Sequence, residues 1–194
     1  MKEVYGSMAL DTNKLYTIDD IMALPEGERA ELIDGQIYYM ACPNMIHQGL
    51  LRELAFAFLS HQRNTDKLCQ TYFAPCAVFI QQDKYNYLEP DLFVICPKDK
   101  NDDRIQFNGC HGAPDLVLEI VSPSSKTMDF VRKHAKYAET GVREYWIVDP
   151  QTERVLVYHF EKDDFPVQYT FQDTIPVGIA DNFSIDFTKL NFRI

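Results

Sequence analysis

The sequence predicts an α/β fold in a single domain, and three segments carry that prediction. Residues 114–122, PDLVLEIVS, are so continuously apolar that they suit a strand covered on both faces, as in the middle of an α/β sheet. Residues 47–63 repeat apolar side chains at helical spacing. Residues 30–41 hold two apolar runs around Asp34-Gly35, which is typical of a β-hairpin. With 194 residues, 46% of them hydrophobic and 25% charged, the chain suits one globular unit.

The first half of the chain reads as a helix, the hairpin, a long helix and two strands. Residues 1–14 show no periodicity, so we expect a flexible N-terminus followed by one domain over residues 15–194. Thr17 can cap a helix over residues 18–24. Asn44 can cap the long helix, whose predicted core-facing stripe is Leu50, Leu51, Leu54, Ala55, Phe58 and Leu59. Residues 71–81 and 87–95 are then expected as strands, and residues 97–114 as a loop.

The second half predicts a central strand, a helix and a β-hairpin. After the apolar run 114–122, residues 129–142 read as a helix that ends at Gly141 in a left-handed cap. Its inner face is expected to carry Val131, Ala135 and Ala138 with Tyr137 or His134. Residues 143–150 and 154–160 are expected to pair as strands across a short turn, and the remaining residues to form short edge strands and a tail.

The charge of the chain argues against tight, non-specific binding to nucleic acid. Asp and Glu number 29 against 19 Lys and Arg, which gives a formal net charge of −10. Because that field repels phosphates, binding of DNA would need metal ions or a local basic cleft. The chain supplies only scattered candidate cations for such a cleft, among them Lys126, Arg132, Lys133 and Lys136.

The cysteine content and the apolar runs indicate where in the cell the protein is expected to be. Five cysteines without a C-x-x-C pair indicate neither a disulfide framework nor a zinc site, so we expect reduced, mostly buried thiols. The sequence has no run of about 18 apolar residues, and its N-terminus lacks the apolar core of a signal peptide. We therefore expect a cytoplasmic protein with no membrane partner.

Two acidic residues associated with apolar runs are the best indication of function. Asp91 precedes one apolar run and Glu119 lies inside another. A buried carboxylate is costly unless it has a partner, and two of them on neighbouring strands suit Mg²⁺ together with waters and a substrate phosphate. The backbone carbonyl of Ile120 could complete the inner sphere, and Lys133 in the next helix could neutralise charge or orient water. This combination is typical of phosphodiester hydrolysis.

Structural roles are the alternative for these carboxylates. Asp91 and Asp115 each follow a proline and could simply begin their strands, and Glu119 could pair with a structural arginine. For Asp115 the structural role is the preferred interpretation. For Glu119 the functional role is preferred, because an unpaired carboxylate inside an apolar run is costly.

Several longer motifs together resemble a known family. They are AELIDGQIYYM, a helix beginning with His47, EPDLFVI, GAPDLVLEIVSPSS and DFVRKHAKYAETGVREYWIVDP. The combination, over about residues 16–160, resembles the Uma-two family of endonucleases in the PD-(D/E)XK restriction-endonuclease-like superfamily. The resemblance implies a restriction-endonuclease-like core, with a mixed central β-sheet flanked by helices, an N-terminal hairpin and a nuclease site that uses a divalent metal.

The resemblance also implies roles for individual residues. Asp91 matches the first metal-binding Asp of the superfamily, and Glu119 matches the acidic residue of its second motif. Val121 stands where the superfamily normally has lysine, and the family's displaced lysine matches Lys133 on the next helix. Lys126 and Lys136 are weaker candidates for that amine.

Two further residues match less specific positions. Glu31 matches an early acidic position of the family and could hold a second metal or orient water, or be a solvated strand residue. His47 could contact phosphate or water, or serve in capping or packing.

The leading hypothesis from sequence is therefore a cytoplasmic endonuclease that uses Mg²⁺, or Mn²⁺, to cut DNA. A homodimer is expected, since cutting both strands of a duplex commonly uses two sites. The acidic surface and Val121 favour a second hypothesis, a catalytically inactive nuclease-fold module with an interaction or regulatory role. A metal-dependent phosphohydrolase for small substrates is the third.

Overall fold

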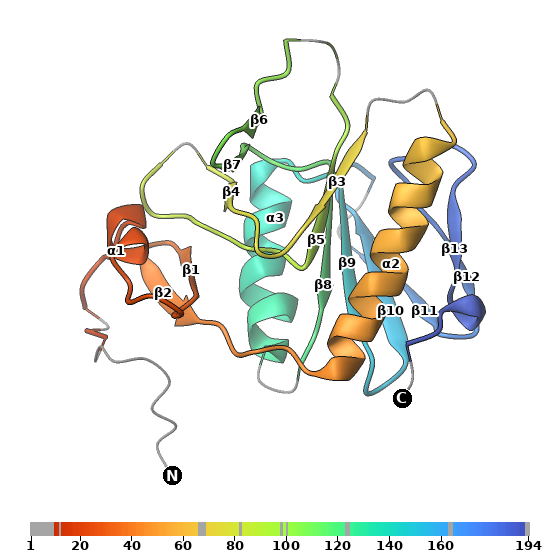
Figure 1. Cartoon of the computed structure of the whole chain (residues 1–194), viewed down its shortest axis with the longest axis horizontal. Helices are drawn as coiled ribbons and strands as arrows, with labels where there is room; N and C mark the ends of the chain where they lie inside the picture. The colour runs from red at the N-terminus through yellow and green to blue at the C-terminus, as the bar shows by residue number, and fades with distance from the viewer. Residues whose placement is uncertain are drawn as a thin grey trace.

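The protein is built around a six-stranded mixed sheet with helices on both faces (Figure 1). The computed structural model describes residues 10–11, 13–65, 69–81, 83–97, 99, 101–122, 125–162 and 165–192. The strands follow the spatial order β11 (Val167–Thr170), β10 (Arg154–His159), β9 (Glu144–Asp149), β8 (Leu116–Ile120), β5 (Leu92–Ile95) and β3 (Gln70–Phe73). The pair β8 and β9 is parallel, and the other neighbours are antiparallel. The predicted α/β fold with a mixed central sheet is confirmed.

Helix α2 (Met45–Arg63) covers one face of the sheet, and the predicted N-cap is confirmed. The side chain of Asn44 accepts a hydrogen bond from the backbone N–H of His47 at 2.9 Å. Leu50 and Leu54 pack in one core with Leu118 of β8. Five of the six predicted stripe residues are buried, and Leu59 is half-buried.

The opposite face of the sheet lies under a helical segment in two parts. Residues Met128–Lys133, labelled η1, form a π-helix that continues into α3 (His134–Thr140). Val117 and Val121 of the central run belong to the core on this side. Since successive strand residues face opposite sides, Glu119 between them also faces η1 and α3.

The predicted inner face of that helix is confirmed at Tyr137, which is fully buried, and is wrong at the three aliphatic positions. Val131 is 59% exposed, Ala135 is exposed and Ala138 is half-buried, whereas Asp129 and Lys133 are buried. The reason is twofold. A π-helical turn holds more residues than an α-helical turn, which changes the residues that share a face. The helix also covers the carboxylate of Glu119, so its inner face is polar there.

The N-terminal hairpin has the predicted turn. Strands β1 (Ala30–Ile33) and β2 (Gln36–Tyr39) pair in an antiparallel register around Asp34 and Gly35, whose φ angles are 50° and 73°. Two consecutive positive φ values are typical of a tight hairpin turn and explain the Asp-Gly pair. Helix α1 (Ile18–Met22) begins where predicted, with Asp20 accepting from the N–H of Thr17 at 2.8 Å, and ends two residues before the predicted end. Most of the predicted flexible segment 1–14 lies outside the described residues.

The expected strand over residues 71–81 is wrong, because the segment forms two strands in different sheets. Pro75 follows β3, and proline has no N–H to continue a ladder. The chain then forms β4 (Val78–Phe79), which joins β7 (Gly109–His111) and β6 (Ile105–Gln106) in a three-stranded sheet. The predicted loop 97–114 therefore contains two short strands. Near the C-terminus, β12 (Thr174–Pro176) and β13 (Ser184–Asp186) pair before the short 3-10 helix η2 (Phe187–Lys189).

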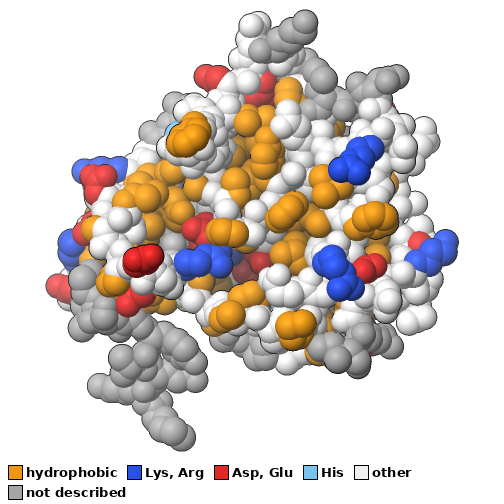
Figure 2. Space-filling model, in the orientation of Figure 1, with side chains coloured by type: hydrophobic (Ala, Val, Ile, Leu, Met, Phe, Trp, Pro, Cys, Tyr) orange, Lys and Arg blue, Asp and Glu red, His pale blue; other side chains and the backbone are white. Residues whose placement is uncertain are grey.

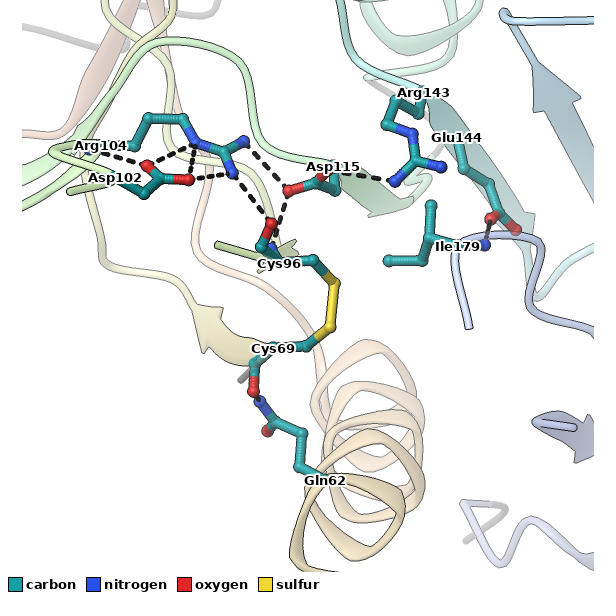
Figure 3. Close-up of a disulfide and its surroundings, with 9 residues drawn as sticks. All are labelled: Gln62, Cys69, Cys96, Asp102, Arg104, Asp115, Arg143, Glu144 and Ile179. Atoms are coloured by element: carbon teal, nitrogen blue, oxygen red, sulfur yellow. Dashed lines mark hydrogen bonds and ion pairs between the residues drawn. A yellow bond between two sulfur atoms is a disulfide. The ribbon is translucent and has the colours of Figure 1, made fainter. Parts of the chain in front are cut away.

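The expectation that all cysteines are reduced is also wrong. Cys69 and Cys96 form a disulfide beside the Arg104–Asp115 network (Figure 3). Strands β3 and β5 pair with Gln70 opposite Ile95, so the next position of the register places these cysteines opposite each other. Their separation of 27 residues gives no sign of this in the sequence. The free thiols differ in exposure: Cys42 is exposed, Cys76 is half-buried and Cys110 is buried.

The described helices include none that is both long enough and apolar enough to span a membrane.

Candidate active site

The two acids singled out in the sequence lie beside each other across adjacent strands. Strands β5 and β8 pair with Leu92 opposite Leu118, so one further step places Asp91 next to Glu119. Asp91 Oδ2 accepts a hydrogen bond from the N–H of Ile120 at 2.7 Å, which fixes Asp91 against the end of β8. The side chain of Glu119 is 5% exposed and that of Asp91 is 17% exposed. Glu119 is therefore the inner carboxylate and Asp91 the outer one.

Lys133 reaches Glu119, the inner of the two acids, from the helix on which the resemblance placed the displaced lysine. Its Nζ lies 2.9 Å from Glu119 Oε1 and 2.9 Å from Glu31 Oε2. Val121, at the position where the superfamily normally has lysine, is instead buried in the apolar core. The amine therefore approaches the carboxylates from the layer above the sheet.

Glu31 belongs to this cluster, which excludes the alternative of a solvated strand residue. It lies on β1, and its side chain is 5% exposed. Its Oε1 accepts a hydrogen bond from the backbone N–H of Glu89 at 2.9 Å, and its Oε2 faces Lys133. The N-terminal hairpin thus supplies one wall of the site.

His47 contacts a carboxylate. Its Nε2 lies 3.1 Å from Asp91 Oδ2, and its backbone is held at the start of α2 by the Asn44 cap. Its buried Nδ1 has no hydrogen-bond partner among the described residues. His47 is therefore placed to orient Asp91.

Two residues of the cluster were missed in the sequence. Asp129 Oδ1 lies 3.7 Å from Lys133 Nζ, and the hydroxyl of Tyr137 donates to Glu119 Oε1 at 3.0 Å. Tyr137 had been assigned only a core role. Asp129, Lys133 and Tyr137 are spaced four residues apart, which places them along one side of a helix. That spacing was the signal available in the sequence.

Burial and charge shift the pKa values of the cluster. Burial raises the pKa of Glu119 well above its usual value against the opposing effect of Lys133, and Asp129 and Asp91 add to the rise. Burial likewise raises the pKa of Glu31 and of Asp129. Burial alone would lower the pKa of Lys133, but the nearby carboxylates outweigh it, and that pKa lies well above its usual value. The lysine is therefore a cation at neutral pH.

The weaker candidates have other partners. Lys126 binds Asp149 at 2.9 Å, and Lys136 binds Asp34 at 2.6 Å. Asp115 accepts from the backbone N–H of Cys96 at 2.7 Å and from two arginines, Arg104 and Arg143 (Figure 3). The structural role preferred for Asp115 is consistent with these contacts.

The donor chemistry of the site fits a hard divalent cation. Among the described residues, Asp91 Oδ1 and Glu119 Oε2 have no hydrogen-bond partner, so each acid keeps one oxygen available. The described part of the chain has no ready-made cage of three or more His, Cys, Asp or Glu side chains. Mg²⁺ commonly takes one or two carboxylates and retains several waters. Two acids and the carbonyl of Ile120 therefore suit it better than a cation that needs an all-protein cage.

Comparisons with known proteins agree with this architecture. The family model "Uma2: Putative restriction endonuclease" matches residues 18–187. An uncharacterized protein from Synechocystis is 28% identical over 164 residues, which cover 82% of each chain. The crystal structure of a "putative nuclease" from Anabaena variabilis aligns with a TM-score of 0.70 at 20% identity, covering 90% of this chain and 96% of that chain. The structural match shows a shared fold.

Proposed function

Because this chain belongs to the Uma2 family, described as "Putative restriction endonuclease", we propose that it is a metal-dependent endonuclease that hydrolyses DNA phosphodiester bonds. Family membership supports a nuclease-like function. Metal dependence, DNA as substrate and the residue roles are our proposal. One observation carries it: four separate elements each bring a charged side chain to one cluster. These side chains are Asp91 just before β5, Glu119 on β8, Glu31 on the hairpin and Lys133 on the helix.

In this proposal Asp91, Glu119 and the carbonyl of Ile120 hold Mg²⁺ or Mn²⁺. When bound, the ion supplies Lewis-acid stabilisation of phosphoryl charge and activation of water. The protein contributes two carboxylates of unequal exposure. The buried Glu119 is fixed by Lys133 and Tyr137, and the more exposed Asp91 lies toward solvent, from which a phosphate would approach.

Lys133 acts as a fixed positive charge in this site. Its raised pKa keeps it protonated at neutral pH, so it can stabilise negative charge on a phosphate but does not act as a general base. Glu31 and Asp129 hold the ammonium group beside Glu119. His47 and Tyr137 are positioning residues, since each contacts one of the two proposed metal ligands.

The test combines metal binding with cleavage. Titration of the wild type with Mn²⁺ by calorimetry is expected to show a site that Glu119→Gln weakens by at least about 100-fold, since even outer-shell changes cost roughly 10- to 100-fold. Glu89→Gln is the matched control, because Glu89 is also a buried glutamate near the cluster but is bound to Arg29. Single-stranded and duplex DNA are then incubated with Mg²⁺, Mn²⁺ or EDTA.

If Glu119→Gln binds Mn²⁺ as tightly as the wild type does, the proposed metal site at Asp91 and Glu119 is refuted. Metal binding without cleavage of either DNA would favour the second candidate, a catalytically inactive nuclease-fold module. The net charge of −10 and Val121 at the usual lysine position support that candidate. Hydrolysis of a small phosphate ester in place of DNA would favour the phosphohydrolase. We also propose a homodimer, and sedimentation at several protein concentrations tests that state separately.

A further inference from the structure

A pocket of about 470 Å³ lies between the central sheet and the small sheet formed by β4, β7 and β6. Its volume is in the range of small-molecule sites. Its lining includes the aromatic rings of Tyr72, Tyr87, Phe93 and Phe107. Figure 2 shows hydrophobic side chains gathered across this face of the molecule, with acidic and basic side chains among them. Most of the side chains that line the pocket are therefore apolar or aromatic.

Two aromatic surfaces could stack on a flat ligand. Tyr72 stacks on Phe93 with ring centroids 5.4 Å apart and planes 22° apart. Phe107, in the turn between β6 and β7, is fully exposed. Phe107 also lines the pocket, so its exposed ring is available to a ligand that enters from solvent.

Besides the tyrosines, three polar side chains line the pocket, Glu89, Gln106 and Asn108, and Glu89 is the charged one. Glu89 Oε2 accepts from Arg29 Nε at 3.0 Å, and Glu89 Oε1 accepts from the hydroxyl of Tyr87 at 2.7 Å. Arg29 Nη2 also donates to Oε2, so three of the roughly four acceptor positions of this carboxylate are taken and about one remains for a donor on a ligand. The described residues that line the pocket include neither Lys nor Arg. These features suit an uncharged ring with an amino group and disfavour a phosphate.

The pocket adjoins the proposed active site through Glu89. The backbone N–H of Glu89 donates to Glu31 Oε1 at 2.9 Å. Glu89 also precedes Asp91 by two residues, which is roughly 7 Å of extended chain. That distance is short enough for one unpaired DNA strand to contact both the pocket and the carboxylates. A base in the pocket would thus belong to a nucleotide close to the phosphate at the carboxylates.

We infer that this pocket binds one unpaired nucleobase carrying an exocyclic amino group, and that the substrate is single-stranded or locally unpaired DNA. The inference rests on the proposed function for the identity of the strand. The base stacks on the aromatic rings, and its amino group donates to Glu89. Because the net charge of −10 weakens attraction to phosphates, stacking supplies much of the affinity. A paired base in a duplex cannot enter without being turned out of the stack.

The test measures binding in EDTA, so that neither metal nor cleavage is involved. Short fluorescent oligonucleotides of cytosine or thymine, and a duplex of the same length, are titrated with protein and followed by anisotropy. Phe107→Ala is expected to weaken binding of the cytosine strand by roughly 5- to 150-fold, the loss of one stacking contact. Phe56→Ala, which removes an exposed phenylalanine from α2, is the matched control and is expected to bind as wild type does.

Glu89→Gln tests the hydrogen bond. Wild type is expected to prefer cytosine over thymine, because only cytosine offers an amino donor to a carboxylate, and the substitution should reduce that preference. Three results would overturn the inference. They are an equal loss of strand affinity in Phe107→Ala and Phe56→Ala, tighter binding of the duplex than of the single strand, and no binding of any strand. Mn²⁺ titration of the wild type separates the two proposals. A wild-type protein that binds Mn²⁺ but no strand rejects the pocket and keeps the metal site, and one that binds the cytosine strand but no Mn²⁺ rejects the metal site and keeps the pocket.

Discussion

Replacing Lys133 by Met is expected to destabilise the protein strongly, because this lysine is the positive charge inside a buried acidic cluster. Its ammonium group lies 2.9 Å from Glu119 and 2.9 Å from Glu31, and 3.7 Å from Asp129. The lysine and these three acids have side chains no more than 5% exposed. Removing one partner of a buried ion pair leaves an uncompensated charge and costs about 3–5 kcal/mol.

The size of the effect can be compared with a matched lysine on the same helical segment. Lys133 and Lys136 are each 4% exposed. The partners of Lys136, however, are the exposed Asp34 and Glu139, with 69% and 53% exposure. Water can solvate those carboxylates once the lysine is gone. Lys136→Met is therefore expected to lose only about 0–1 kcal/mol of ion-pair energy, and both variants lose a similar aliphatic stem.

Urea denaturation and thermal melting, followed by circular dichroism, measure the difference. For a domain of this size 1 kcal/mol corresponds to about 2–4 °C, so Lys133→Met is expected to lower Tm by about 6–20 °C at pH 7. The loss should shrink as pH falls toward 5, because the buried carboxylates have raised pKa values and take up protons before those of the unfolded chain. A Lys133→Met variant as stable as Lys136→Met at pH 7 would refute the account of the cluster.

Three further outcomes are expected. Asp115→Ala should cost about 3 kcal/mol in urea denaturation, since it leaves the N–H of Cys96 and the guanidinium groups of Arg104 and Arg143 without their shared acceptor; an effect below about 1 kcal/mol would contradict its structural role. Asn44→Ala should cost about 1 kcal/mol through loss of the cap on α2, while Asn44→Asp should keep most of the stability. The pKa of Lys133 is raised in the fold, so the stability that its charge contributes is fully present below about pH 10.4 and should be lost as pH rises above that value. An equal loss of stability at alkaline pH in wild type and Lys133→Met would contradict this prediction.

Local signals in the sequence predicted most of the fold. The Asp34-Gly35 turn, the Asn44 cap and the apolar stripe of α2 each depend on neighbouring residues, so they can be found without knowing the tertiary structure. The central strand was equally clear, because its length and continuous apolarity suit a strand covered on both faces. The single strand predicted over residues 71–81 is wrong, because Pro75 cannot donate a ladder hydrogen bond and the chain changes sheets there.

The candidate site was predicted in outline by the resemblance to the family. The structure brings Asp91, Glu119, Glu31 and Lys133 together, and His47 joins them through Asp91. Asp129 and Tyr137 were missed because the usual expectation for the inner face of a helix is apolar. In this protein that face meets a charged residue of the sheet, and a π-helical turn changes which side chains share it.

The sequence by itself determined the helices, the turns and the buried central strand, since those follow from spacing and backbone preference over a few residues. Only the tertiary structure decided which side chains meet across strands and layers. The register of β5 against β8 pairs Asp91 with Glu119, and the register of β3 against β5 pairs Cys69 with Cys96. Such pairings depend on the relative placement of distant segments, and a shift of one residue would turn each side chain to the opposite face.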